Sequence, residues 1–240
     1  MTKPFRQSIN WGQAFAEVVL IFIGVGVALL ADRWVDERNQ REEERQYLLS
    51  LRADFEETKV SLQRSLEDIR RNRDLKLKLM RLMQGPPDAI KEDELSQMIQ
   101  ESFYMQMPAA TMATYADMVN SGDLRLLRDA TLRLKLAEFE NGWRDYWSVI
   151  EEGFSQWNQL QVPFLVSRAR IASVYSSGYG GVEFPVSHQP IDRKTFWSRE
   201  FENILAVSVI SREDMISVGE QMVKKTIEIL QLIDRSLEMG

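Results

Sequence analysis

Residues 14–31 of the chain read AFAEVVLIFIGVGVALLA, an apolar run that only one acid, Glu17, interrupts. Tryptophans flank this run at Trp11 and Trp34, and the helical rise from one to the other is about 35 Å. A hydrocarbon layer is about 30 Å thick, and indole rings favour its two interfaces. The stretch therefore predicts a transmembrane anchor over residues 11–34, with Trp11 and Trp34 as membrane-interface anchors.

A cleaved signal peptide is the alternative interpretation, because Gly26-Val27-Ala28 weakly resembles a cleavage site. The apolar run is long for a signal peptide and leads directly into a charge-rich helical sequence. We therefore expect the anchor to be retained, as a single pass through a bacterial inner membrane with the lipid bilayer as its first partner.

Charges on the two sides of the anchor give conflicting indications of its orientation in the membrane. Two basic residues lie in the short N-terminal tail, residues 1–10, and four arginines follow the run before residue 46. Counted alone, they place the following domain in the cytoplasm. The acids of residues 32–46 outnumber those arginines, long domains cross membranes largely regardless of charge, and a cysteine-free chain suits an oxidising compartment. We expect a cytoplasmic N-terminus and a periplasmic body.

Small residues and the lone acid share one face of the expected anchor. At 100° per residue this face spans about 80°, and Gly26 lies opposite it. Small residues let a second helix approach closely, and an intramembrane carboxylate usually faces protein. The alternative is that Glu17 reaches the headgroups and interacts with the positive helix start. The members of this expected transmembrane interface are Glu17, Ile21, Gly24, Ala28 and Ala31.

Residues 35–84 predict a long charged helix, because no glycine or proline occurs before Gly85-Pro86-Pro87. Apolar residues recur every seventh position, whereas the intervening positions Thr58 and Asn72 are polar. This coiled-coil-like stripe is expected to pack on helices of the same chain or of a neighbour. Its members are Leu48, Phe55, Leu62 and Ile69.

Charges cover the rest of the long helix. At spacings of four residues, Glu37 and Arg38 can pair with Arg41 and Glu42, whereas Arg41 and Arg45 repel each other. A basic cluster follows farther along, and we expect it to be a solvated helix face rather than a site for an anionic partner. Its members are Arg70, Arg71, Arg73, Lys76, Lys78 and Arg81.

Residues 85–240 predict a helical bundle domain. A helix is expected from Asp88 to before Pro108, and a last helix is expected to reach Met239 and return antiparallel along the long helix. Between them, aromatic residues recur at helical spacing before Pro163, which should kink or break their helix. This face is expected to be core or helix interface rather than a ligand-stacking wall. Its aromatic members are Phe139, Trp143, Trp147, Phe154 and Trp157.

The glycine-rich loop at residues 173–191 is longer than usual, so it is functional, locally hairpin-like or mobile. Residues 178–181 resemble a phosphate loop only superficially, because no Lys-Ser/Thr pair follows them. His188 lies here and is expected to be solvated.

Composition argues against catalysis and against several kinds of partner. The 240 residues contain no cysteine and one histidine, so we expect no catalytic residues, no cofactor and no metal site. A net charge of -6 argues against a nucleic-acid partner. The charge is uneven: it is almost absent from the first 31 residues, dense through residue 84 and acidic beyond it. The sequence predicts an all-α fold, in which a transmembrane helix continues into a long charged helix of an elongated antiparallel bundle.

Two stretches resemble an uncharacterised bacterial family of single-span, membrane-anchored helical proteins. One contains Glu17-Val18-Val19-Leu20-Ile21 and Glu37-Arg38, and the other reads Asn120-Ser121-Gly122-Asp123-Leu124-Arg125-Leu126. Neither stretch is a catalytic motif. The resemblance implies a membrane-anchored helical protein, and it implies that Glu17 belongs to a family pattern.

Three functional hypotheses follow from these features. The first is a non-enzymatic membrane-anchored scaffold that self-associates as a homo-oligomer through its anchor and long helix. The second is an accessory subunit that docks onto other membrane-protein subunits through the face of Glu17, Gly24 and Ala28. The third is a periplasmic sensor or ligand-binding bundle. A sensor would need an output domain, and the tail of about ten residues before the anchor disfavours this hypothesis.

Overall fold

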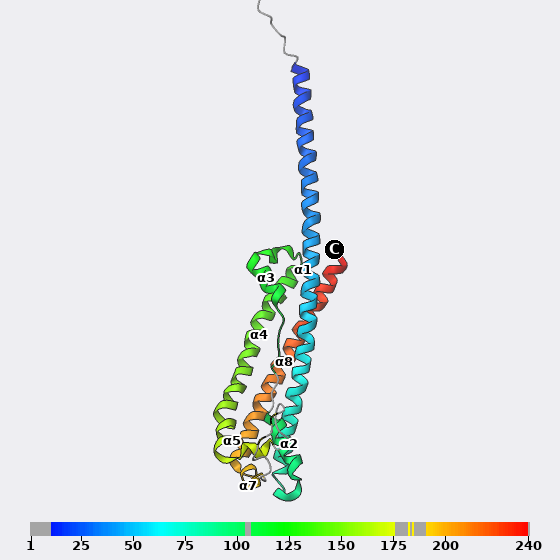
Figure 1. Ribbon diagram of the computed structural model, residues 1–240. Coiled ribbons are helices and arrows are strands. Elements are labelled where there is room, and N and C mark those ends of the chain that lie inside the picture. The colour runs from blue at the N-terminus through cyan, green and yellow to red at the C-terminus, as the bar shows by residue number, and fades with distance from the viewer. Residues whose placement is uncertain (1–10, 104–106, 176–181, 183, 185–190, 240) are drawn as a thin grey trace, which may run out of the picture.

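The computed structural model describes residues 11–103, 107–175, 182, 184 and 191–239 (Figure 1). Every regular element in these ranges is helical, which confirms the all-α fold. In chain order the elements are α1 (Trp11–Leu82), the 3-10 turn η1 (Pro87–Ala89), α2 (Glu92–Phe103), α3 (Ala113–Ser121), the 3-10 turn η2 (Asp123–Leu126), α4 (Ala130–Gln156), the π-helical turn η3 (Trp157–Gln161), α5 (Val162–Arg168), α6 (Ile171–Val174), α7 (Arg193–Phe196) and α8 (Arg199–Met239).

Helix α1 is one continuous helix of 72 residues, about 108 Å long. It ends where the sequence predicts, because Gly85 donates its backbone N–H to Leu82 O at 3.0 Å and two prolines follow. Its N-terminal part extends beyond the other helices, whereas its C-terminal part belongs to the bundle (Figure 1). Among the described residues, no helix combines the length and the apolar character that a membrane span requires.

Helices α1, α4 and α8 form the body of the bundle. Helices α1 and α4 run in the same direction, and α8 returns antiparallel to both, so that the C-terminus lies beside the middle of α1 (Figure 1). The largest hydrophobic cluster joins these three helices, and Phe55 meets Phe139 edge to face at 5.0 Å between ring centroids. The stripe of α1 is buried, with Leu48, Phe55 and Leu62 in this cluster and Ile69 in a smaller one with Met215 and Ile216; all four stripe residues are no more than 3% exposed.

The aromatic face of α4 is divided between two clusters. Phe139 is buried in the first cluster, and Trp143, Trp147 and Phe154 pack against it while half-buried. Helix α4 ends at Gln156, and the π-helical turn η3 follows before Pro163. This turn places Trp157 in a second cluster, where its ring lies 5.5 Å from that of Phe103. The chain therefore changes from α-helical to π-helical pairing before the proline, and Pro163 lies in the first turn of α5.

The second cluster closes the end of the bundle that lies away from the free part of α1. It joins α2, α5 and α7 to the start of α8, with Phe164 stacked on Phe201 at 5.4 Å. The expected start of a helix at Asp88 is wrong by a few residues, because η1 and extended Ile90 precede α2. Arg193 donates to Ile90 O at 2.9 Å, and Ile90 is buried, so this extended connection is fixed by tertiary contacts.

The opposite end of the bundle is formed by α3, η2 and the start of α4. Asp54 of α1 accepts the backbone N–H of Thr114 at 2.9 Å, and Thr58 accepts that of Thr111 at 2.9 Å. Gly122 ends α3 with φ +80°, a left-handed conformation that favours glycine. Asp129 then caps α4 by accepting the N–H of Thr131 at 2.7 Å. These bonds fix the short segments against α1.

Candidate functional site

The expected transmembrane interface lies on the free part of α1. The side chains of Trp11, Glu17, Ile21 and Ala28 lie outside the described part of the structure. Gly24 is exposed, and a Cβ added there would meet no atom within 4 Å. Ala31 and Trp34 are also exposed.

The free part of α1 exposes large apolar side chains. Phe15, Leu20 and Phe22 are each more than 70% exposed, and Trp34 is 63% exposed. Glu44 is half-buried, and Leu48 is the first fully buried residue described on α1, where the bundle begins. Contiguous apolar surface of this kind usually marks a membrane or protein contact.

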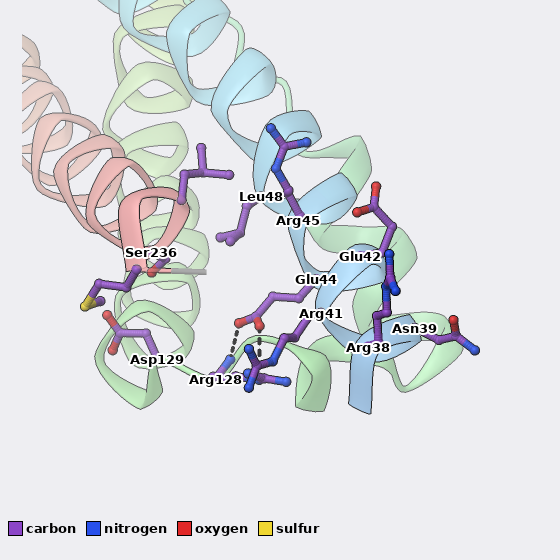
Figure 2. Close-up of a pocket in the computed structure, with 12 residues that line it drawn as sticks. Arg38, Asn39, Arg41, Glu42, Glu44, Arg45, Leu48, Arg128, Asp129 and Ser236 are labelled. Carbon is purple, nitrogen blue, oxygen red and sulfur yellow. Dashed lines mark hydrogen bonds and ion pairs between the residues drawn. The ribbon is translucent and has the colours of Figure 1, made fainter. Parts of the chain in front are cut away.

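A pocket lies where α1 enters the bundle, between α1, the start of α4 and the last turns of α8 (Figure 2). We call it the arginine pocket. Its volume is about 690 Å³, within the range of small-molecule sites. Its lining residues are Arg38, Asn39, Arg41, Glu42, Glu44, Arg45, Leu48, Arg128, Asp129, Ser236, Leu237 and Met239.

The three acids of the arginine pocket already have partners. Glu44 accepts the backbone N–H of Arg128 at 2.7 Å, and its other oxygen lies 3.3 Å from Arg128 Nε, so that α1 is joined to the start of α4 (Figure 2). Asp129 is occupied as the cap of α4, and Glu42 accepts Gln46 Nε2 at 2.9 Å. The carboxylate oxygens of these three acids therefore already accept contacts from other groups of the chain.

Three arginines of the pocket lack a carboxylate partner within the described chain. Arg38 lies over the Trp34 ring at 5.9 Å, and neither of the expected pairs from Glu37 to Arg41 and from Arg38 to Glu42 forms an ion pair there. Arg41 and Arg45 are exposed and one helical turn apart, so their charges repel. The pocket is therefore suited to an anion.

A second cluster of polar groups is buried where α1, α2 and α8 meet. Lys76 is fully buried and donates to Asn72 Oδ1 and to Ser102 O, and Arg212 Nε donates to the same Asn72 oxygen at 3.1 Å. Asn72 Nδ2 donates to Glu101 O and Ser102 O at 3.0 and 2.7 Å. Residues 101 and 102 belong to the last turn of α2, whose partial negative charge favours cations.

Burial lowers the pKa of both cations in this cluster. It lowers the pKa of Lys76 well below its usual range, and the positive charge of Arg212 lowers it further. Burial also lowers the pKa of Arg212 to about 10, which leaves this guanidinium charged at neutral pH. The expectation that Lys76 belongs to a solvated basic face is therefore wrong, because its side chain lies in the α1–α2–α8 junction.

Neither cluster follows completely from the sequence. A stripe continuing from Ile69 through Asn72 and Lys76 to Leu79 has helical spacing, and it was the available signal for the buried cluster. No sequence signal links Arg45 to Arg128 or to the end of α8. His188 and the glycines of the loop at 173–191 lie outside the described residues. In the part of the chain that is described, no group of three His, Cys, Asp or Glu side chains could hold a metal ion.

Comparisons with known proteins add no relative: the chain matches no protein-family model, no curated protein and no solved structure. Its resemblance to an uncharacterised family of single-span membrane proteins stays a prediction. A role for the chain must therefore be argued from the chemistry of α1 and of the arginine pocket.

Proposed function

We propose that the chain is a non-enzymatic, membrane-anchored helical scaffold that self-associates through its anchor and the adjoining part of the long helix. The observation that carries the proposal is the continuity of α1, which runs without a break from its buried stripe in the bundle back to Trp11. A rigid helix of this kind holds the bundle at a fixed distance from whatever covers its free part.

The apolar surface of the free part supports a bilayer as that covering. Phe15, Leu20 and Phe22 extend into solvent unless lipid or protein covers them. The proposal rests on the full sequence of residues 14–31, of whose side chains the structure describes only a part. We further propose a single pass through a bacterial inner membrane, with residues 1–10 in the cytoplasm and the bundle in the periplasm.

Helix α1 has a part buried in the bundle and a free part, and only the free part is available for self-association. The stripe from Leu48 to Ile69 is used inside the chain and is not available to a second copy. The exposed part before Tyr47 remains, and Gly24 on it leaves room for a close helix approach. Glu17 shares this face in the sequence pattern. We therefore assign the contact between copies to residues 17–31.

The same open surface at Gly24 supports one other candidate, an accessory subunit whose anchor docks on another membrane protein. The two candidate functions differ in what covers the face of Gly24, which is a second copy of this chain in the first and a different protein in the second. A foreign subunit held through Glu17 would be present in fixed ratio, and a Glu17→Leu variant would lose it.

Membrane insertion can be tested by alkaline extraction of membranes and by labelling. Because the chain has no cysteine, Thr2→Cys and Glu152→Cys each provide one thiol. A membrane-impermeant maleimide added to spheroplasts should label Glu152→Cys and leave Thr2→Cys unlabelled. Release of the wild-type chain by alkali would contradict the anchor, and the reverse labelling pattern would contradict only the orientation.

Self-association can be tested by oxidative cross-linking in membranes. Gly24→Cys should give a disulfide-linked dimer, because paired cysteines require Cα atoms about 4.4–6.8 Å apart. Gly26→Cys, on the opposite face, is the matched control and should remain monomeric. Adding Glu17→Leu to Gly24→Cys should reduce cross-linking. Equal cross-linking at both positions would indicate random collision and contradict the assigned face.

A further inference from the structure

We propose that the arginine pocket binds the phosphate of an anionic phospholipid headgroup. This inference rests on the proposed function, because a bilayer reaches the pocket only if residues 14–31 lie in it. Arg38, Arg41 and Arg45 supply the charge, and the end of α8 closes the pocket opposite α1 (Figure 2).

The distribution of partners in the pocket favours an anion over a cation. Glu44 already accepts one backbone hydrogen bond and forms an ion pair with Arg128, and Asp129 accepts two backbone hydrogen bonds. Arg41 and Arg45, by contrast, have no carboxylate within the described residues. A phosphate between these two guanidinium groups would relieve their repulsion and accept charge-assisted hydrogen bonds from both.

The position of the pocket along α1 favours a lipid as the source of that phosphate. Arg38 follows Trp34 by one turn, and their contact at 5.9 Å fixes the arginine beside the ring. With Trp34 at the interface, Arg38 and Arg41 lie about 6 and 10 Å farther along the axis. Headgroup layers are about 5–8 Å thick on each side, so both side chains reach the phosphates. Arg45, about 16 Å from Trp34, lies at the distal wall of the pocket.

The apolar residues of the pocket fit the remainder of such a ligand. Leu237 and Met239 of α8 and Leu48 of α1 line it together with the arginines. Met239 is 78% exposed, so the last turn of α8 offers apolar surface beside the charged wall. A free inorganic phosphate would leave this surface unused, whereas the headgroup carbons that follow the phosphate of a phospholipid would contact it.

The test is lipid binding by the full chain in detergent, followed by native mass spectrometry during titration with phosphatidylglycerol or phosphatidylcholine. We expect phosphatidylglycerol to bind more tightly. The variant Arg41→Gln/Arg45→Gln should weaken its binding about ten-fold or more. The matched control, Arg64→Gln/Lys224→Gln, removes the same charge from exposed positions of α1 and α8 outside the pocket and should change binding little.

Two results would overturn the inference directly. One is equal affinity for the two lipids, and the other is an equal loss of affinity in the two double variants, which would indicate general charge attraction. Unchanged helical circular dichroism of both variants would exclude unfolding as the cause of a loss. Competition by millimolar inorganic phosphate as effective as that by the lipid would overturn the lipid as the ligand.

Alkaline extraction of the membranes from which the chain is purified separates this inference from the proposed function. A chain that stays in membranes but does not distinguish the two lipids would overturn the inference and leave the anchor intact. A chain that alkali releases would overturn the anchor and the lipid source together, even if phosphate binding persisted.

Discussion

Glu44 on α1 holds Arg128 at the start of α4 through two different groups, the backbone N–H at 2.7 Å and the guanidinium Nε at 3.3 Å. The two residues are separated by 84 positions in the chain. This contact closes the end of the bundle at the level where α1 becomes free. It also occupies the carboxylate that would otherwise neutralise the arginines nearby.

Replacing Glu44 with alanine should destabilise this end of the bundle. The Glu44 side chain is only 12% exposed and accepts the N–H of Arg128, so its loss should cost about 1 kcal/mol. Thermal unfolding of the full chain in detergent measures the change. Glu42→Ala is the control, because its bond to Gln46 lies on an exposed helix surface and should contribute less than about 0.5 kcal/mol. Equal effects of the two variants would contradict a special role for Glu44.

Stability should depend on pH through Lys76. Burial lowers the pKa of Lys76 in the folded state, whereas the pKa of lysine in the unfolded chain is near 10.4. Between these two pKa values, Lys76 is neutral in the folded chain and protonated in the unfolded chain, so the unfolded state binds one more proton. The wild-type free energy of unfolding should therefore rise with pH within this window. Below the folded-state pKa, both states are protonated and Lys76 contributes no slope. Denaturant titrations from pH 7 to about pH 9.5 measure the effect, which is at most about 1.4 kcal/mol per pH unit.

Lys76→Met should remove this rise, because methionine has nothing to titrate in the buried junction. Lys78→Met, on the exposed neighbouring face, is the control and should keep the wild-type slope. The titrations stop at about pH 9.5 because Tyr146 contributes at higher pH. Burial raises the pKa of Tyr146 to about 12, so its contribution lowers stability as pH rises from about 10 toward 12. A wild-type slope in Lys76→Met would contradict the assignment.

Close packing at Gly219 gives a further prediction. A Cβ at this position would lie 2.7 Å from Leu66 Cδ2 and 2.8 Å from the hydroxyl oxygen of buried Tyr146. Gly219→Ala should therefore destabilise the chain by about 1–3 kcal/mol, despite the better helix propensity of alanine. Gly142→Ala provides the comparison, because its closest contact is the flexible end of Lys225 at 2.6 Å. Thermal unfolding should show a lower midpoint only for Gly219→Ala, and equal midpoints would contradict the packing argument.

The fold of α1 follows from local sequence to a large extent. Its C-terminal end is set by Gly85 and two prolines, and the positions of Leu48 and Phe55 mark the face that packs in the bundle. These features depend on helix period and on backbone chemistry, which a single sequence displays. In the sequence, Thr58 and Asn72 are polar interruptions of the coiled-coil-like stripe. In the structure both are buried and hydrogen-bonded to segments far away in the chain.

The candidate site was much less predictable. Arg41 and Arg45 share a helix face in the sequence, but their pocket also needs Arg128 and the end of α8, which tertiary packing brings there. The sequence predicts a solvated Lys76 because this lysine lies in a run of charged residues, which usually forms a solvated face. Its burial depends on the carbonyl of Ser102, whose place at the end of α2 becomes apparent only when the helices are packed.

The central claim, self-association through the anchor, is tested most directly by the mass and composition of the particle that carries this chain in native membranes. Extraction into polymer nanodiscs followed by native mass spectrometry would measure both. We predict two or more copies of the 27.9 kDa chain and no stoichiometric foreign subunit. Particles with one copy of the chain, alone or with a different protein in fixed ratio, would contradict the account.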